Sequence, residues 1–241
     1  MNIPLVSVRM ITYNQVEFVS KAIESVLRQK VNFTYELLIG EDASTDGTAD
    51  IVDYYQKKYP DIIKVFHRKK NVGYRANGQY IINQCYGKYI AVLEGDDYWN
   101  YNLKMQKQVD YLEKHTNIVS TAHNVCSIDK NGKLLDDYYI DFPYQKSHVY
   151  NSDNARKFEQ FGHLSGIVYR NIRYILNDDQ WRAYTKCKIN GDLKLWLTLG
   201  MLGKNIYSSK IWSCRRRVFE GTSWSAITYQ KNITYILFQQ Y

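Results

Sequence analysis

Three carboxylates end an apolar run near the middle of the sequence. The run YIAVLE finishes in Glu94, and Asp96 and Asp97 follow with only Gly95 between them. Like charges this close repel and desolvate one another, so their presence at the end of a strand indicates a bound cation. Mg²⁺ and Mn²⁺ take oxygen ligands and are often held by one or two carboxylates together with substrate phosphates. The segment predicts a divalent metal site, with an acidic turn that caps the following helix as the alternative.

Two further polar clusters follow apolar runs nearer the N-terminus. Thr12, Tyr13 and Asn14 follow LVSVRMI, and the segment EDASTDGT, residues 41–48, ends the run YELLI. The ring of Tyr13 could close over a flat base, or pack within a turn. Asp46-Gly47 predicts a tight turn with Thr48 as the helix N-cap. That capping role leaves Glu41 and Asp42 unexplained, and either carboxylate could accept the imide N–H of uracil.

Apolar runs alternate with helical patterns through the first half of the chain. This βαβα alternation with short connections predicts an α/β fold with a doubly wound, mostly parallel sheet. Ligands bind beyond the carboxyl ends of the strands in such sheets, so the three polar clusters are expected on one rim. The expected strands are 5–11, 35–41, 62–67 and 88–94, and the expected helices are 16–29, 48–59, 77–86 and 103–115.

The second half is less regular. Its patterns favour strands over 118–124 and 166–169, a hairpin loop at 129–133, and helices over 152–161 and 192–202. The sequence contains no internal repeat, low-complexity tract or linker, so we expect one domain over 1–241. The apolar C-terminal segment NITYILFQQY could pack on the body of the protein or touch a membrane.

Composition limits the function classes. The chain has 241 residues, 45% of them hydrophobic, which is enough for a full core. Its net charge of +8 favours an anionic partner, which could be nucleic acid, a phosphorylated small molecule or a membrane surface. The four cysteines lie far apart and the histidines lack metal-site spacing, so neither zinc nor a disulfide framework is supported. With no apolar run of roughly 20 residues and no signal-peptide pattern, a cytoplasmic location is expected.

Five motifs occur in an order that is specific when taken together. VRMITYN, EDASTDGT, NVG at 71–73, GKYIAVLEGDDYW and NGDLKLW resemble the family 2 glycosyltransferases of the GT-A fold, particularly bacterial enzymes that build surface polysaccharides. The resemblance covers residues 5–115 strongly and 191–225 more weakly. It implies a Rossmann-like GT-A domain in which 1–115 binds the nucleotide-sugar and 116–241 binds the acceptor.

The resemblance also implies roles for individual residues. Asp42 would contact the nucleobase, and Asp96 the ribose or sugar. Asp97, with Asp96, would hold a Mg²⁺ or Mn²⁺ ion that bridges the diphosphate. Asp192 would be the general base, although its local sequence alone favours a helix cap. The expected nucleotide-sugar-binding set is Thr12, Tyr13, Asn14, Glu41, Asp42, Asn71, Asp96 and Arg217.

Two positions depart from the family pattern. Gly191 stands where many relatives have Glu before the base. Phe219 stands where many relatives have the His of a Tyr-Arg-x-His motif, and a phenyl ring can neither ligate a metal nor donate to phosphate. Arg217 can still pair with a diphosphate.

The function expected from the resemblance is an inverting hexosyl- or N-acetylhexosaminyltransferase. It would move a sugar from a UDP-sugar to a saccharide or polyprenyl-linked acceptor, with peripheral association at the inner face of the membrane as a further expectation. A sugar nucleotidyltransferase needs a glycine-rich basic loop after the first strand, which TYNQVEF is not. The alternative from another class is a non-catalytic basic protein that binds nucleic acid or anionic membrane, although no nucleic-acid motif occurs. Such binding would fall steeply with salt and ignore manganese.

Overall fold

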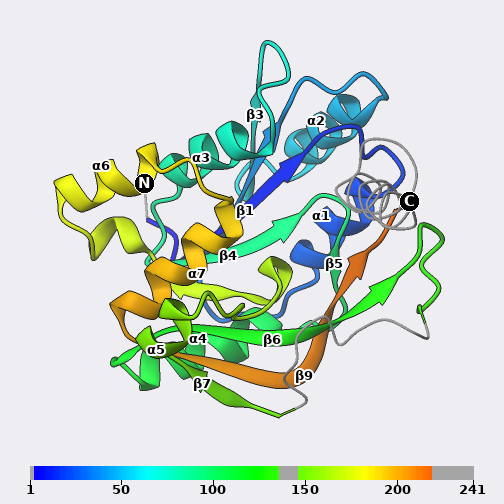
Figure 1. Cartoon of the computed structure of the whole chain (residues 1–241). Helices are drawn as coiled ribbons and strands as arrows, with labels where there is room; N and C mark the ends of the chain where they lie inside the picture. The colour runs from blue at the N-terminus through cyan, green and yellow to red at the C-terminus, as the bar shows by residue number, and fades with distance from the viewer. Residues whose placement is uncertain (1–2, 136–145, 219–241) are drawn as a thin grey trace, which may run out of the picture.

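A computed structural model describes residues 3–135 and 146–218 and shows one mixed sheet covered by helices on both faces (Figure 1). The strand order is β3-β2-β1-β4-β8-β6-β9-β5, with β7 beside β9. The strands are β1 (Val6–Thr12), β2 (Tyr35–Glu41), β3 (Ile63–His67), β4 (Tyr89–Glu94), β5 (Tyr98–Trp99), β6 (Ile118–Ile128), β7 (His148–Tyr150), β8 (Val168–Arg170) and β9 (Lys204–Arg216). The helices are α1 (Val19–Leu27), α2 (Thr48–Lys58), α3 (Tyr74–Gln84), α4 (Lys104–Lys114), α5 (Ser152–Arg156), α6 (Asp178–Lys186) and α7 (Gly191–Leu202), with short 3₁₀ turns η1 (Leu164–Gly166) and η2 (Ile172–Tyr174).

The first four strands form the parallel sheet that their apolar runs predict. β2 and β4 flank β1, and β3 lies outside β2, all in parallel register. Since β1 is buried on both faces, its side chains pack into two hydrophobic cores, one on each face of the sheet. Val6, Val8 and Met10 pack with α1, α2 and α4, whereas Ile11 belongs to the core under α3 and α7. The doubly wound α/β prediction is confirmed, and the ends of the four helices expected in this half differ from the observed ends by no more than three residues.

The second half extends the sheet with strands of both directions. β8 is antiparallel to β4 and to β6, and the long strand β9 is parallel to β6. β9 therefore runs in the same direction as β1 and β4, and its carboxyl end reaches the same rim. The four longest pairings in the sheet are parallel.

Two elements predicted in this half differ in length from those in the structure, and a predicted hairpin loop is present. The helix expected over 152–161 ends at Arg156, because Phe158 takes a left-handed conformation (φ 56°) just beyond the C-cap. The strand expected over 118–124 continues to Ile128. The expected hairpin loop is present, since an antiparallel bridge joins Ile128 to Leu134 and the Asp129 carboxylate accepts from the Lys133 N–H.

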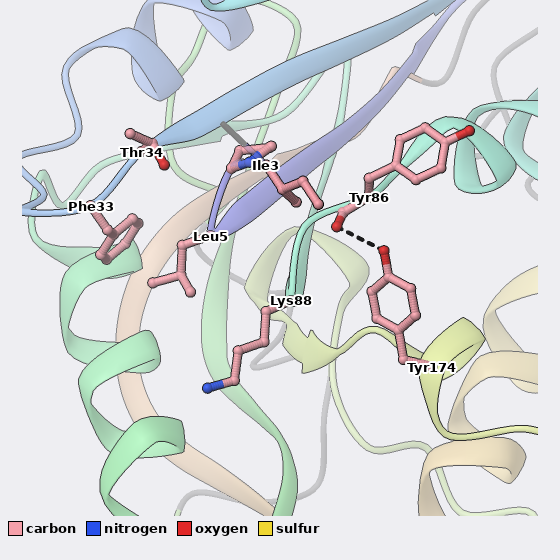
Figure 2. A pocket seen from close by; sticks show the side chains of 8 residues that line it. Ile3, Leu5, Phe33, Thr34, Tyr86, Lys88 and Tyr174 are labelled. Atoms are coloured by element: carbon pink, nitrogen blue, oxygen red, sulfur yellow. Dashed lines mark hydrogen bonds between the residues drawn. The ribbon is translucent and has the colours of Figure 1, made fainter. Parts of the chain in front are cut away.

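An open hollow of about 530 Å³ lies at the opposite rim, where β1, β2 and β4 begin (Figure 2). Its lining is mainly apolar, and the Tyr174 hydroxyl donates to the Tyr86 carbonyl at 2.9 Å along one wall. None of its lining residues carries a carboxylate; they are Ile3, Pro4, Leu5, Phe33, Thr34, Tyr86, Lys88 and Tyr174. The carboxylate clusters lie at the other rim, so this hollow is separate from them.

Candidate functional site

The polar clusters meet at the carboxyl rim of the sheet. Thr12 ends β1, Glu41 ends β2 and Glu94 ends β4, in neighbouring parallel strands. Gly95 seats the loop after β4 against β1, since a Cβ there would clash with Gln15 Oε1 and lie 2.9 Å from Thr12 Oγ1. The Thr12 hydroxyl in turn donates to Gln15 Oε1 at 2.8 Å. The first and third clusters are therefore in direct contact.

Asp97 is held almost completely inside the protein, with 3% of its surface exposed. Its Oδ1 accepts the backbone N–H of Arg216 at 2.9 Å, and His163 Nδ1 lies 3.6 Å from its Oδ2. Burial, and then the nearby charge of Asp96, raise the pKa of Asp97 well above its ordinary value. Burial also lowers the pKa of His163 to about 3, so that imidazole is neutral at pH 7.

Glu94 and Asp96 share this charged environment. Burial raises the pKa of Asp96, while Arg216 and Arg215 oppose the shift. Burial likewise raises the pKa of Glu94 to about 7, against the attraction of Arg9, whose guanidinium lies 3.5 Å from the Glu94 carboxylate.

The donor set fits a hard divalent cation. Two adjacent carboxylates, Asp96 and Asp97, have pKa values raised by burial, and that of Asp97 is raised further by repulsion from Asp96; a bound cation would reverse both effects. No three His, Cys, Asp or Glu side chains among the described residues converge into a complete metal site. The chain therefore suits Mg²⁺ or Mn²⁺ completed by substrate oxygens, and Asp97 with Asp96 would hold the ion.

Asp192 lies in the first turn of α7 but does not cap it. Asn190 is the N-cap, and its side chain accepts from the backbone N–H groups of Asp192 at 2.9 Å and Leu193 at 3.4 Å. The Asp192 carboxylate is left half-buried, and burial raises its pKa while Arg9 and Arg215 lower it. The capping alternative is thus excluded, and the position remains suited to a proton acceptor.

Asp42 organises the neighbouring loop. Its two carboxylate oxygens accept the backbone N–H groups of Val72 and Gly73, each at 2.9 Å, and only 2% of the residue is exposed. Asn71 in the same loop is exposed and accepts from the Gly73 N–H at 3.0 Å. Glu41 is also buried and binds the backbone of its own turn, at Ala43 and Ser44.

The loop after β1 presents two exposed residues. Tyr13 is 37% exposed, and Asn14 takes a left-handed conformation (φ 50°). Asn14 accepts the Thr45 N–H at 2.9 Å, which ties the first cluster to the second.

The capping prediction at the second cluster was wrong in detail. Gly47 is the N-cap of α2 and Thr48 is already helical, while Asp46 Oδ1 accepts from the Thr48 N–H at 3.0 Å. The Thr48 hydroxyl oxygen instead accepts the Gln15 N–H at 2.8 Å, so it links α2 to the loop after β1.

The arginines at the end of β9 make different contacts. Arg216 turns inward, and its guanidinium donates to the carbonyls of Asp96, Asp129 and Lys130. Arg217 is half-buried just beyond the strand, and its N–H donates to the Ile128 carbonyl. Phe219, the segment 221–225 and the C-terminal apolar segment lie outside the described residues.

Two residues near these carboxylates were not predicted from the sequence as site residues. Arg9 interrupts an apolar run in a central strand, a signal that could have identified it. Gly78 on α3 leaves the room that the guanidinium needs, because a Cβ at Gly78 would clash with it. His163 gave no such signal, since it reaches Asp97 only through the fold.

The comparisons with known proteins agree with this arrangement. The model of the family "Glycosyl transferase family 2" matches residues 7–177. The chain is 34% identical over 164 residues to an uncharacterized protein of Mycobacterium tuberculosis, which is 68% of this chain and 46% of that protein. It is 29% identical over 205 residues to TuaG of Bacillus subtilis, covering 85% of this chain and 75% of TuaG, whose name provisionally assigns it to teichuronic acid biosynthesis as a glycosyltransferase. The chain spans about half the length of the first of these relatives.

Solved structures show the same fold at low identity. S. aureus TarS in complex with UDP superposes with a TM-score of 0.65 at 18% identity, covering 88% of this chain and 60% of that one. The mannosyltransferase PcManGT of Pyrobaculum calidifontis, in complex with GDP-Man and Mn²⁺, gives a TM-score of 0.61 at 14% identity and covers 89% and 57%. The fold is that of the GT-A glycosyltransferases, and the chain belongs to glycosyl transferase family 2.

Proposed function

We propose that this protein is an inverting, metal-dependent glycosyltransferase that uses a UDP-sugar, with Asp192 as the general base. The observation that carries the proposal is the meeting of Asp97, Asp96 and the loop after β1 at one rim, with Asp192 left free of a capping role. Family membership makes a transferase the chemistry to test at that rim.

The donor would lie across the ends of β1, β2 and β4. Each oxygen of Asp42 binds one backbone N–H and keeps a second lone pair, so the carboxylate could accept uracil N3–H while holding the 71–73 loop. Tyr13 offers an exposed ring beside this loop system. TarS was solved with UDP and with UDP-GlcNAc, which supports the choice of nucleotide.

The diphosphate end would lie by Asp97 and Asp96, where Arg217 would add a positive charge. A divalent cation there would supply Lewis acidity toward the departing diphosphate. Asp97 is already fixed by the Arg216 N–H, so its free carboxylate edge is oriented in advance.

Asp192 would take the proton from the acceptor hydroxyl as the new glycosidic bond forms. Burial raises its pKa, which makes it a better base, and the charges of Arg9 and Arg215 oppose that rise and favour the ionised form. One base and one metal ion would support a single displacement with no covalent intermediate, hence inversion at the anomeric carbon. A hexosyl or N-acetylhexosaminyl group moving to a saccharide or lipid-linked acceptor in surface-polysaccharide synthesis is the matching substrate class, and residues 116–241 would bind that acceptor.

A role for the membrane would come only from the acceptor substrate. Among the described residues, no helix combines the length and apolarity needed to cross a bilayer. We propose a cytoplasmic site of action, with peripheral association at the inner face of the membrane if the acceptor is polyprenyl-linked. A non-catalytic basic binder of nucleic acid or anionic lipid is disfavoured, because the net charge of +8 does not explain three carboxylates gathered at a strand end with Asp97 buried among them.

The test is thermal unfolding with UDP in the presence of Mn²⁺ or of a chelator. UDP with Mn²⁺ at about 100 times its Kd should stabilise the native state by about 2.7 kcal/mol, and the chelator should remove most of the effect. For a domain of this size that is a rise in Tm of roughly 5–10 °C.

Asp97→Ala should lose the metal-dependent part of this shift. Asp110→Ala, an exposed acid on the outer helix α4, is the matched control and should respond like the wild type. Equal shifts with and without metal would count against the Asp97 assignment. Binding that ignores UDP and Mn²⁺ but falls steeply with salt would favour the non-catalytic alternative.

A further inference from the structure

Two cysteines far apart in sequence face each other beside the metal-binding loop. Cys126 on β6 and Cys214 on β9 are register partners, and their Sγ atoms lie 3.0 Å apart with both thiols free. Cα atoms of register partners on neighbouring strands are about 4.8 Å apart, within the range of about 4.4–6.8 Å that a disulfide spans. The backbone spacing of the two cysteines is therefore one that a disulfide accepts.

The surroundings of the pair favour reaction at Cys214. The Asn100 side-chain amide points at its sulfur from 3.6 Å, and Cys126 directs its S–H at the same atom. These hydrogen bonds, that of Cys126 foremost, together with one from Tyr98 lower the pKa of the Cys214 thiol to about 6 despite burial. Cys126 is only half-buried, so a small oxidant can reach the pair from its side.

The other two cysteines lack this arrangement. Cys85 is buried, and burial raises its pKa to about 12, so it is inert. Cys187 is half-buried at the C-cap of α6, with no neighbouring thiol among the described residues. They serve as internal controls for any reaction of the pair.

We propose that Cys126 and Cys214 form a redox-reactive dithiol that closes to a reversible disulfide under hydrogen peroxide. The Cys214 thiolate attacks one peroxide oxygen, the O–O bond breaks, and Cys214 sulfenic acid and water result after protonation of the departing hydroxide. The Cys126 sulfur then attacks the Cys214 sulfur, the S–S bond forms, and the S–O bond breaks to release a second water. Two thiols and one peroxide give one disulfide and two waters.

The strand that carries Cys214 also positions the proposed metal ligand. Cys214 is the register partner of Tyr98, which follows Asp97 directly, and two residues later Arg216 donates its N–H to the Asp97 carboxylate. Closing the sulfur–sulfur distance from 3.0 Å to about 2.05 Å pulls β9 toward β6 next to these contacts. The disulfide should therefore weaken the metal-dependent binding of UDP, a consequence that rests on the proposed function.

The first experiment maps the thiols without any assay of function. Reduced wild-type protein is treated with equimolar hydrogen peroxide, quenched with catalase, denatured, alkylated and analysed by peptide mass spectrometry. We expect Cys126 and Cys214 to escape alkylation and to appear as one disulfide-linked peptide pair, while Cys85 and Cys187 are alkylated. Dithiothreitol should reverse the change. Four alkylated cysteines, or a bridge that includes Cys85 or Cys187, would overturn the proposal.

Matched variants define the chemistry. Cys187→Ser should still form the bridge, whereas Cys126→Ser should stop at a Cys214 sulfenic acid that dimedone traps. A Cys126→Ser protein whose Cys214 remains unmodified would remove Cys214 as the reacting thiol. If this variant does not fold, the wild type and Cys187→Ser still decide the proposal.

The second experiment compares the thermal shift by UDP and Mn²⁺ for the oxidised and reduced wild type. A smaller shift after oxidation that dithiothreitol restores supports the link to Asp97, and equal shifts overturn that link. A protein in which neither form responds to UDP and Mn²⁺ contradicts the proposed function, while the thiol map independently decides whether the dithiol exists.

Discussion

Arg9 supplies a positive charge next to Glu94 at the carboxyl rim of the sheet. Its guanidinium lies 3.5 Å from Glu94, its side chain is 14% exposed, and its charge opposes the rise that burial causes in the pKa of Asp192. A buried cation of this kind is stabilising mainly because its partners would otherwise be buried charges without compensation.

Arg9→Met should therefore lower the free energy of unfolding by about 1–3 kcal/mol at pH 8.5, where Glu94 is ionised and is left without its partner. Adding Glu94→Gln should restore much of the loss. Urea unfolding at pH 8.5 measures both, with Arg28→Met as the control. Arg28 pairs with Glu24 at 3.9 Å on an exposed surface, so its replacement should change stability by less than about 1 kcal/mol. Equal losses at both arginines would contradict the role given to Arg9.

The titration of Glu94 gives a stability change with a definite sign. Burial raises its folded-state pKa from the usual 4.5 to about 7. Between these values the native state holds a proton that the unfolded chain has released, so stability falls as pH rises through this window and levels off above about 7. In the presence of a chelator the fall due to Glu94 should be about 3 kcal/mol.

Glu94→Gln should flatten this part of the curve of unfolding free energy against pH, measured from pH 4.5 to 8. Glu113→Gln is the comparison. Its carboxylate pairs with Lys88 on the surface, and that hydrogen bond lowers its pKa, so it contributes with the opposite sign. A Glu94→Gln protein with an unchanged slope would show that Glu94 does not titrate in this window.

Asp192→Asn separates catalysis from binding. The amide keeps the shape of the carboxylate but cannot accept a proton, and the cap of α7 is untouched because Asn190 provides it. Turnover should fall by about 10²-fold or more, while the stabilisation by UDP and Mn²⁺ persists. With a working donor and acceptor, NMR of the wild-type product should show an inverted anomeric centre. Near-normal turnover of the variant, or a retained configuration, would remove Asp192 from the role of base.

At the scale of elements, α7 is fixed against the body by its closest approach to α5. A Cβ added at Gly200 would lie 2.6 Å from Ala155 Cβ and 2.8 Å from the ring of Tyr150, whereas a Cβ at Gly191 meets no atom within 4 Å. One helix thus offers both a crowded glycine and an open one. The open position is also the one at which the family resemblance leads us to expect Glu, so crowding does not explain the missing side chain.

Gly200→Ala should destabilise the protein by about 1–3 kcal/mol because α7 must move away from α5. Gly191→Ala, at the start of the same helix, should be neutral or stabilising by up to about 1 kcal/mol through the unfolded state. Urea midpoints at a constant m-value measure the difference. If the two variants lose equal stability, the packing of α7 on α5 is looser than the distances indicate.

At the scale of the whole molecule, the predictable part is the part built from continuous apolar runs. β1, β2 and β4 are buried on both faces and are followed by turn residues, so both their direction and the rim at their ends follow from the pattern. The long strand β9 escaped prediction because polar residues such as Asn205 and Ser213 fill buried positions in it. Helix α6 has no fully buried residue, and its apolar side chains Trp181 and Tyr184 pack against the core only partly buried.

The residues of the candidate site could likewise be predicted only where local sequence brings them together. Glu94, Asp96 and Asp97 were identified because local sequence brings them together. His163 and the N–H of Arg216 meet Asp97 only through tertiary structure, so no local pattern could assign them. Local sequence also could not distinguish Asn190 from Asp192 as the cap, because both residue types accept helix N–H groups well.

The hydrogen bond from Arg216 to Asp97 joins residues 119 positions apart in the chain. Synthesis proceeds at about 5–20 residues per second, so the strand that orients this carboxylate leaves the ribosome roughly 6–24 seconds after the carboxylate itself. During that interval the parallel strands β1 to β4 can already pair, while Asp97 still lacks its N–H donor. A nascent chain that stalls before β9 would carry a formed parallel half of the sheet with a poorly oriented Asp97 carboxylate. The order of translation therefore makes the surroundings of Asp97, at the carboxyl rim of the sheet, one of the last parts of the fold to reach their final geometry.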